Sequence, residues 1–280
     1  MNLTPEQLKS NWDKLIGIVE DTFEGTRKDN LLKMYNYFED RMMFAPASGV
    51  IYYHNAFPGG YVCHILNITK FALKLYDMYK DIGMHTSEYT KEDIIFCTLH
   101  HDLGKVGNLD QDYYVPNESE WHRINQGKMY NYNEKLHYMS VTDRTIWLLN
   151  YFDIKTSELE FIAFRLADGM YEEANKAYLK GYGEDKNLKT NLPILIHNAD
   201  TLATRWEKEQ YMFSKDSDIN YGKILNSKLE EVVSEKDIVD AAEPSTVPDP
   251  VPSEIKPPTS KTKTITSKNS KDLFDELFGD

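Results

Sequence analysis

Four side chains in this 280-residue chain bind metal ions readily and would be costly to bury alone. His101 and Asp102 are neighbours in the apolar segment IIFCTLHHDLGK, and His64 follows a Gly-Gly pair. Asp200 lies in a second apolar segment, LIHNADTLATRW. A carboxylate in such surroundings requires a compensating cation. We therefore expect His64, His101, Asp102 and Asp200 to hold a divalent metal ion together.

This donor set restricts the metal and the chemistry. Two imidazoles and two carboxylates suit Mn²⁺, Fe²⁺, Co²⁺, Ni²⁺ or Zn²⁺, and the carboxylates leave Mg²⁺ open. A water molecule on such an ion loses a proton near neutral pH and can attack phosphorus. We expect Asp102 to hold the metal and orient this water. Lys105, which follows Gly104, is expected to stand free and meet a phosphate.

The elements that must position these residues are predicted to be helices. Thr4, Pro5 and Gln7 form a helix start with a cap, an N1 proline and a capping-box glutamine. Apolar spacing and capping signals predict further helices over 29–43, 60–81, 91–105, 134–152, 158–179 and 192–211. The best strand signal, at 50–53, is short. The sequence therefore predicts an all-α bundle over residues 1–235.

Residues 107–133 are polar, rich in tyrosine and only weakly periodic. A long irregular insertion of this kind is commonly a lid or a binding loop, and it is also typical of a solvated connector. Tyr113, Tyr114, Tyr130 and Tyr132 could stack on a nucleobase or anchor the loop itself. The sequence leaves both interpretations open.

The runs GGYVCH, HHDLGK and Ala199-Asp200 together resemble the HD-domain phosphohydrolase superfamily, whose pattern is H…HD…D on a helical bundle. The resemblance covers about residues 45–210. The stretch APAS-(x)4-YHNAFPGGYVCH looks like the HD domain of bacterial 3′→5′ exoribonucleases. The resemblance implies that the four residues named above are metal ligands and that Lys105 faces the phosphate.

The superfamily also includes two-metal members with two further histidines between the HD pair and the last aspartate. His137 stands where the first is expected. At the second, which is often followed by His-Gly, this chain has Ala167-Asp168-Gly169, so Asp168 is a candidate ligand. His122 is a further candidate. One metal ion is expected, and a second stays open.

The implied substrate is a phosphorylated nucleotide or an oligonucleotide, with nucleotidase, phosphodiesterase and nuclease activities all open. Cations could contact it from several positions, although each is also typical of a solvated surface: Lys105, Arg123, Lys128, Arg165 and Arg205. His54 precedes the Gly-Gly turn and could support His64 or face the substrate. His197, one turn before Asp200, is a further pocket candidate.

The net charge of −13 argues against a large, non-specific nucleic-acid surface, although a metal and local cations can invert the field within a cleft. No apolar run approaches the roughly 18 residues of a membrane-spanning helix. The N-terminal residues do not resemble a signal peptide. We therefore predict a cytoplasmic protein without membrane contact, in the host cytoplasm if it is viral. Cys63 and Cys97 predict no disulfide framework.

The composition changes towards the C-terminus. Residues 236–268 are rich in Pro, Ser, Thr and Lys and predict a disordered linker. Residues 269–280 form an amphipathic peptide with Leu273, Phe274, Leu277 and Phe278 on one face. It resembles the C-terminal peptide by which DNA polymerases of tailed phages bind a sliding clamp. The alternatives are a tail that folds back and a non-catalytic HD-fold adaptor recruited to a replication or transcription partner.

Overall fold

A computed structural model describes residues 3–181, 183 and 187–216, all within one compact unit. Helices dominate this part of the chain, which confirms the all-α expectation. The helices are α1 (Pro5–Thr22), α2 (Gly25–Phe44), α3 (Gly60–Asp81), α4 (Lys91–His100), α5 (Glu120–Gln126), α6 (Val141–Tyr151), α7 (Glu158–Leu166), α8 (Lys176–Leu179) and α9 (Leu192–Asp216).

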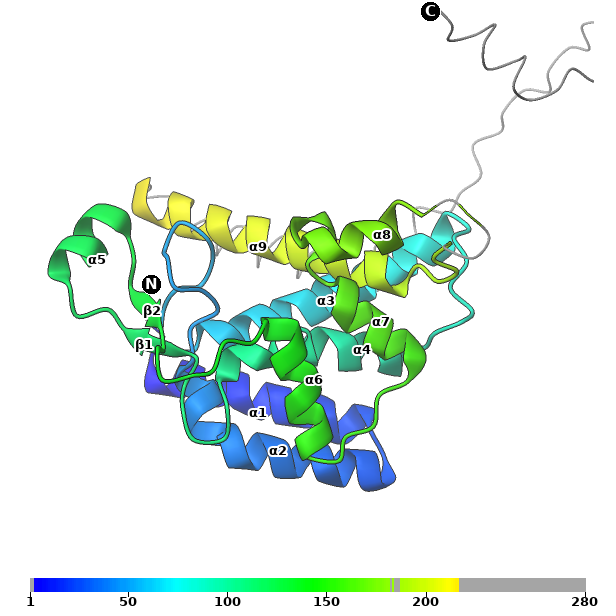
Figure 1. Cartoon of the computed structure of the whole chain (residues 1–280), viewed down its shortest axis with the longest axis horizontal. Helices are drawn as coiled ribbons and strands as arrows, with labels where there is room; N and C mark the ends of the chain where they lie inside the picture. The colour runs from blue at the N-terminus through cyan, green and yellow to red at the C-terminus, as the bar shows by residue number, and fades with distance from the viewer. Residues whose placement is uncertain (1–2, 182, 184–186, 217–280) are drawn as a thin grey trace, which may run out of the picture. The chain divides into compact units, whose positions relative to one another are not determined.

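Helix α3 is the centre of the bundle. It packs against α1, α2, α4 and α9, and Figure 1 shows it between the α1–α2 pair and α9. Its apolar positions repeat at helical spacing on more than one face, so several neighbouring helices pack against it. The largest fully buried side chains come from several elements and include Tyr35, Tyr61, Phe23, Phe38, Phe96 and Phe164.

Local capping signals correctly locate the starts of α1 and α4. Thr4 and Gln7 form a capping box at α1, and Thr90 and Asp93 form one at α4. Each box satisfies backbone N–H groups that the first helical turn leaves unpaired. Helix α2 ends at Phe44, before the Ala-Pro pair, because the residue before a proline disfavours helical geometry.

A buried ion pair joins the start of α2 to α7. The Nη2 atom of Arg27 lies 2.5 Å from Oε1 of Glu160, whose side chain is fully buried. Glu160 also caps α7 through Ser157, and the Arg27 guanidinium stacks over the ring of Phe96. Since the carboxylate has no access to water, it depends on the Arg27 guanidinium for a compensating charge.

Two predicted helices are shorter than expected. The fourth ends at His100, and Leu103–Val106 form a separate 3-10 turn (η1). A Cβ atom at Gly104 would lie 2.1 Å from the carbonyl oxygen of Val141, so the glycine allows close contact with α6. Residues 134–140 are not helical, because Ser140 caps α6 at Val141.

The predicted helix over 158–179 is broken after Leu166. Gly169 has a positive φ of +55°, which a helix cannot accommodate, and its Cβ position is filled by the ring of His197. Short 3-10 turns at Gly169–Tyr171 (η2) and Glu173–Asn175 (η3) then lead into α8. At this break the backbone of Gly169 lies against the ring of His197 on α9.

The tyrosine-rich insertion has more regular structure than its sequence predicts. Strands β1 (Tyr114–Pro116) and β2 (Tyr130–Tyr132) pair antiparallel, and α5 lies between them in the chain. Figure 1 shows this unit projecting from one end of the bundle. The strand expected at 50–53 is reduced to an isolated bridge between Val50 and Lys128.

Candidate metal centre

His64 begins the second turn of α3, behind a tightly packed turn. Gly59 has a left-handed backbone conformation (φ +84°), and a Cβ atom at Gly60 would lie 2.0 Å from the carbonyl oxygen of Asn55. Only glycine permits this approach. The turn thus directs His64 into the interior, where the residue is only 1% exposed.

His101 and Asp102 follow the last turn of α4. The Nδ1 atom of His101 lies 2.9 Å from the carbonyl oxygen of Thr98. Its N–H donates to that oxygen, so Nε2 is the nitrogen that faces the acidic cluster. Asp102 is 8% exposed, and its position is fixed by η1, whose Gly104 N–H donates to Thr145 Oγ1 at 2.8 Å.

The four predicted ligands come together from α3, from the turn after α4 and from α9. The Nε2 atom of His64 lies 3.3 Å from Asp200 Oδ1 and 3.8 Å from Asp102 Oδ2, and His101 Nε2 lies 3.4 Å from the same Asp102 oxygen. Ligand atoms of His64, His101 and Asp102 all lie within 4.8 Å of one another. Asp200 is supplied by α9, where Thr204 Oγ1 donates to it at 3.3 Å.

The chemistry of this cluster fits a cation. Both Nε2 atoms, of His64 and of His101, are buried and lack a hydrogen-bond partner. An unpaired buried polar atom is costly, and each of these points at carboxylates that also need positive charge. Two imidazole nitrogens and two carboxylates form a donor set that suits a divalent transition metal.

Electrostatics within the cluster favour positive charge. Burial opposes a charged imidazole at His64, but Glu207 and Asp200 outweigh it and raise the pKa of His64 to about 10. Burial likewise opposes charge at His101, and Asp102 raises its pKa. Although burial favours the neutral acid, the nearby imidazoles of His64 and His101 lower the pKa of Asp200 to about 2. A metal ion would take the place of the protons on the imidazoles.

Lys105 is not free, contrary to the expectation from the sequence. Its Nζ atom lies 2.6 Å from Asp102 Oδ2. Burial opposes its charge, but the Asp102 carboxylate raises the pKa of Lys105 above its ordinary range. In turn, despite burial, Lys105 and His101 hold the pKa of Asp102 well below its ordinary value. A metal ion would therefore share this carboxylate with an ammonium group.

Glu207 is a functional candidate that sequence reasoning missed. It is 3% exposed, and its Oε2 atom lies 2.9 Å from Nδ1 of His64. Asn67 Nδ2 donates to Oε1 of the same carboxylate at 2.8 Å. Glu207 lies seven residues after Asp200, two helical turns on the same face. That spacing is the only sequence signal for it.

A cleft of about 570 Å³ adjoins the centre and includes Asp200 and Lys105 in its lining. Two more cations, Arg205 and the unpredicted Lys208, lie on its α9 side. Six tyrosines contribute to its walls: Tyr52, Tyr53, Tyr113, Tyr114, Tyr132 and Tyr171. Tyr130 lines other cavities instead. The cleft thus combines a candidate ligand, cations and flat aromatic rings.

Two further histidines line the same cleft. Both ring nitrogens of His54 are buried without a hydrogen-bond partner, and its ring centroid is 4.4 Å from that of His64. Burial lowers the pKa of His54 to about 2, so this imidazole is neutral. The Nδ1–H group of His197 donates to the carbonyl oxygen of Ala167 at 2.8 Å.

The candidates for a second metal site do not join a metal-binding cluster. His122 and His137 are both exposed, on α5 and on the segment before α6. Asp168 is exposed at the edge of the cleft. Among the residues that the structure describes, the groups able to hold an ion contain none of the three. Two groups able to hold an ion are found there: His64 with His101 and Asp102, and His64 with His54 and Glu207. Both groups contain His64, so a single centre at this imidazole has the stronger geometric support.

Three of the predicted substrate cations are engaged elsewhere. Arg123 donates to the carbonyl oxygen of Asn117 within the insertion, and Arg165 donates to Asn175 Oδ1 at 3.0 Å. Lys128 lines a separate hollow beside the insertion. The two arginines make local contacts, and the lysine a placement, that the sequence does not reveal. Of the original set, Lys105, Arg205 and His54 remain in the cleft.

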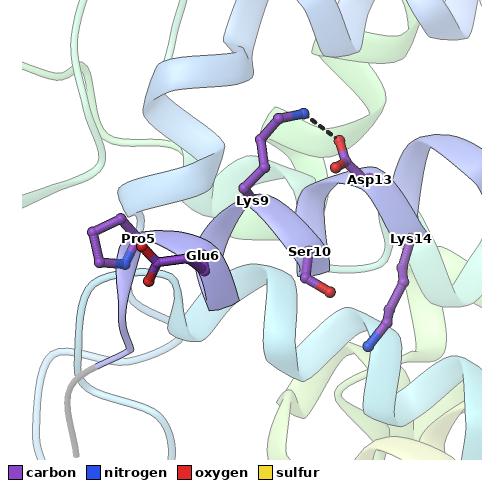
Figure 2. A pocket seen from close by; sticks show the side chains of 6 residues that line it. All are labelled: Pro5, Glu6, Lys9, Ser10, Asp13 and Lys14. Atoms are coloured by element: carbon purple, nitrogen blue, oxygen red, sulfur yellow. Dashed lines mark hydrogen bonds and ion pairs between the residues drawn. The ribbon is translucent and has the colours of Figure 1, made fainter.

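A further hollow lies along α1 (Figure 2). Its six lining side chains, from Pro5 to Lys14, come from this one helix and are all exposed. Lys9 and Asp13 form an ion pair across it at 2.5 Å. Exposed pairs of this kind contribute little, so we regard the surface as a solvated helix face.

Comparison with protein-family models, with curated proteins and with solved structures gives no match to this chain. None of the described helices is long and apolar enough to cross a membrane. Leu273, Phe274, Leu277 and Phe278 lie outside the described residues, as do 236–268. Clamp binding and the adaptor function accordingly stay predictions.

Proposed function

We propose that this chain is a metal-dependent phosphohydrolase that cleaves phosphoester bonds of a nucleotide or a nucleic acid. The observation that carries the proposal is the buried cluster in which two unpaired imidazole nitrogens face two carboxylates. The cluster adjoins a cleft that contains cations. The resemblance of GGYVCH, HHDLGK and Ala199-Asp200 to HD-domain phosphohydrolases supports the same reaction class.

His64, His101, Asp102 and Asp200 would hold the ion. When bound there, a divalent ion supplies positive charge for a phosphoryl oxygen and lowers the pKa of a water molecule. The residues of the chain prepare this site in two ways. Buried helices fix the ligands before substrate arrives, and Lys105 keeps Asp102 ionised while adding a positive charge at the cleft.

The rest of the cleft suits an anionic, aromatic substrate. Lys105, Arg205 and Lys208 provide local positive charge in a chain with a net charge of −13. Tyr113, Tyr114 and Tyr132 pack against one another on the wall of the cleft, and the exposed ring of Tyr132 offers a flat face on which a base can stack. A substrate with both a phosphate and a base is a nucleotide or the end of a nucleic-acid strand.

The test is metal analysis of the full chain, followed by a hydrolysis screen. We expect about one transition-metal ion per chain, and release of phosphate or nucleotide from a panel of nucleotides, cyclic nucleotides and short oligonucleotides with Mn²⁺. The double variant His101→Ala/Asp102→Ala should lose both the ion and the activity, because it removes two of the four ligands.

The matched control is His85→Ala, which removes an exposed histidine outside the cluster and should change neither metal content nor turnover. A wild-type chain that binds no Mn²⁺, Co²⁺ or Zn²⁺ would rule out the metal centre. A chain that binds metal but hydrolyses no phosphoester in the panel would argue against the proposed reaction.

A further inference from the structure

The carboxylate of Glu207 is buried beside the candidate metal centre and, of the four predicted ligands, contacts His64. At 3% exposure it is almost removed from water. Within the described residues, its ion-pair partner is His64, at 2.9 Å, and its second hydrogen bond comes from Asn67, at 2.8 Å. A buried carboxylate needs such compensation, so Glu207 and His64 depend on each other.

The hydrogen bond to Glu207 determines which nitrogen of His64 is available. Because Nδ1–H donates to Oε2, Nε2 is directed at Asp200 and Asp102. His101 differs, since its Nδ1–H donates to the neutral carbonyl oxygen of Thr98. Only one of the two imidazoles therefore has a charged acceptor behind it.

The seam between α3 and α9 aligns these groups. Asp200 and Glu207 are two turns apart on α9, and His64 and Asn67 are one turn apart on α3. Each acidic residue thus meets a polar residue of the facing helix. The packing of α9 on α3 therefore places both Asp200, a predicted ligand, and Glu207 against His64.

We propose that Glu207, held by Asn67, is a positioning residue that orients His64 and strengthens its Nε2 atom as a metal ligand. A carboxylate behind an imidazole fixes the ring orientation and increases its basicity. The inference rests on the proposed metal centre and adds a residue to it. It also implies an asymmetric centre, in which His64 is the stronger imidazole ligand and His101 the weaker.

The surroundings of Glu207 provide a direct way to test this role. A cavity of about 450 Å³ lies behind it, lined by Asn67 and Glu207 and by apolar groups such as Phe57 and Trp206. If Glu207 is shortened to alanine, the cavity gives a small carboxylate such as formate a route to the vacated position next to Nδ1 of His64.

The experiment measures Co²⁺ affinity and the Co²⁺ absorption spectrum of the full chain. Glu207→Gln preserves the shape and can still accept from Nδ1–H, while Asn67 can rotate its amide to present an oxygen. We expect its Co²⁺ affinity to fall about 10- to 100-fold, with an altered ligand-field spectrum. Glu209→Gln, an exposed neighbour on α9, removes the same charge and should bind as wild type.

Chemical rescue separates positioning from a purely structural role. Glu207→Ala should bind Co²⁺ more weakly than Glu207→Gln, and added formate should restore part of the affinity and of the wild-type spectrum. Formate should have no effect on Glu209→Gln. Circular dichroism establishes that each variant is folded; if Glu207→Ala is not, the isosteric Glu207→Gln alone decides the matter.

Two failures are distinguishable. A wild-type chain that binds no Co²⁺ overturns the metal centre and the role of Glu207 with it. Wild-type affinity and an unchanged spectrum in Glu207→Gln, from a chain that does bind Co²⁺, overturn the positioning role and leave the centre intact. A folded Glu207→Ala that formate does not restore also counts against it.

Discussion

The candidate metal centre and the rim of the cleft lie next to each other but are built in different ways. The predicted ligands come from α3, from the turn after α4 and from α9, and His64 and Asp102 are 1% and 8% exposed. The rim is formed largely by short strands and loops, and Tyr53 and Tyr132 are 62% and 66% exposed. Packing fixes the side chains of the candidate centre, whereas solvent surrounds much of the rim.

This difference implies a division of roles. The centre pairs its charges internally, so its geometry does not depend on a substrate. Rim residues such as Arg205 have no such partner within the cluster and can adapt to what binds. Substitutions in the centre should therefore change metal binding and turnover together, and substitutions on the rim should change substrate affinity alone.

The strongest test of the centre is Asp102→Asn. This carboxylate lies within 4 Å of His64, His101 and Lys105, so loss of its charge affects every partner. We expect metal affinity to fall by more than the roughly 100-fold typical of an outer-sphere residue, and hydrolysis to fall with it. Isothermal titration with Mn²⁺ measures the affinity. Asp168→Asn, on the exposed rim, is the control. Equal losses of Mn²⁺ affinity in both variants would contradict the distinction between centre and rim.

Lys105 tests the boundary between the two regions, because it contacts Asp102 and lines the cleft. Lys105→Ala should reduce kcat about 100-fold by removing positive charge near the phosphoryl group. Its metal affinity should not decrease, since the ammonium no longer competes for Asp102 Oδ2. Lys128→Ala, at a lysine outside the cleft, provides the control. A parallel decrease in metal affinity would mean that Lys105 acts through Asp102 and not on the substrate.

His100, a buried histidine on α4, allows a prediction about how stability depends on pH. It is fully buried, with Tyr35 and the Phe96 carbonyl oxygen as hydrogen-bond partners at 2.9 and 2.7 Å. Burial lowers the pKa of His100 from 6.5 to about 3. The unfolded chain therefore takes up a proton below pH 6.5 that the folded chain excludes, and stability is lost as the pH falls from about 6.5 towards 3.

His100→Gln removes this titration while retaining hydrogen-bonding groups. The free energy of unfolding should decline less steeply with acid than in the wild type, by up to about 1.4 kcal/mol per pH unit. Urea unfolding at pH 7, 6 and 5 gives the slope. His85→Gln, at an exposed position, should retain the wild-type slope. Identical slopes for His100→Gln and wild type would show that burial of this imidazole does not govern acid sensitivity.

The sequence identifies the four residues that cluster in the candidate centre better than it identifies the residues of the rim, for a physical reason. The cost of burying His101-Asp102 and Asp200 in apolar helices is visible locally, and so are the capping boxes at Thr4 and Thr90. Glu207 is not distinguishable from Glu209 without the packing of α9 on α3, because its partner His64 is 143 residues away. Contacts of that range depend on the fold.

The same dependence on tertiary contacts explains why the sequence could not identify the cations of the rim. Arg123, Arg165 and Lys128 are as plausible as Arg205 in the sequence, but their surroundings depend on how the insertion and the segment after α7 fold. The pairing of β1 with β2 and the break at Gly169 are tertiary outcomes. Residue type alone identified candidate cations there and could not rank them.

The smallest expected effect comes from the α9 side of the rim. Arg205→Ala/Lys208→Ala should raise KM about 3- to 10-fold at low salt, because two cations near the phosphate contribute modest, screened attraction. The increase should shrink as ionic strength rises, and kcat and Mn²⁺ affinity should stay near wild type. Steady-state kinetics at two salt concentrations measures both parameters. Lys128→Ala is the matched control, since this lysine lies outside the cleft. A loss of Mn²⁺ affinity in the double variant would contradict the division between a rigid centre and an adaptable rim.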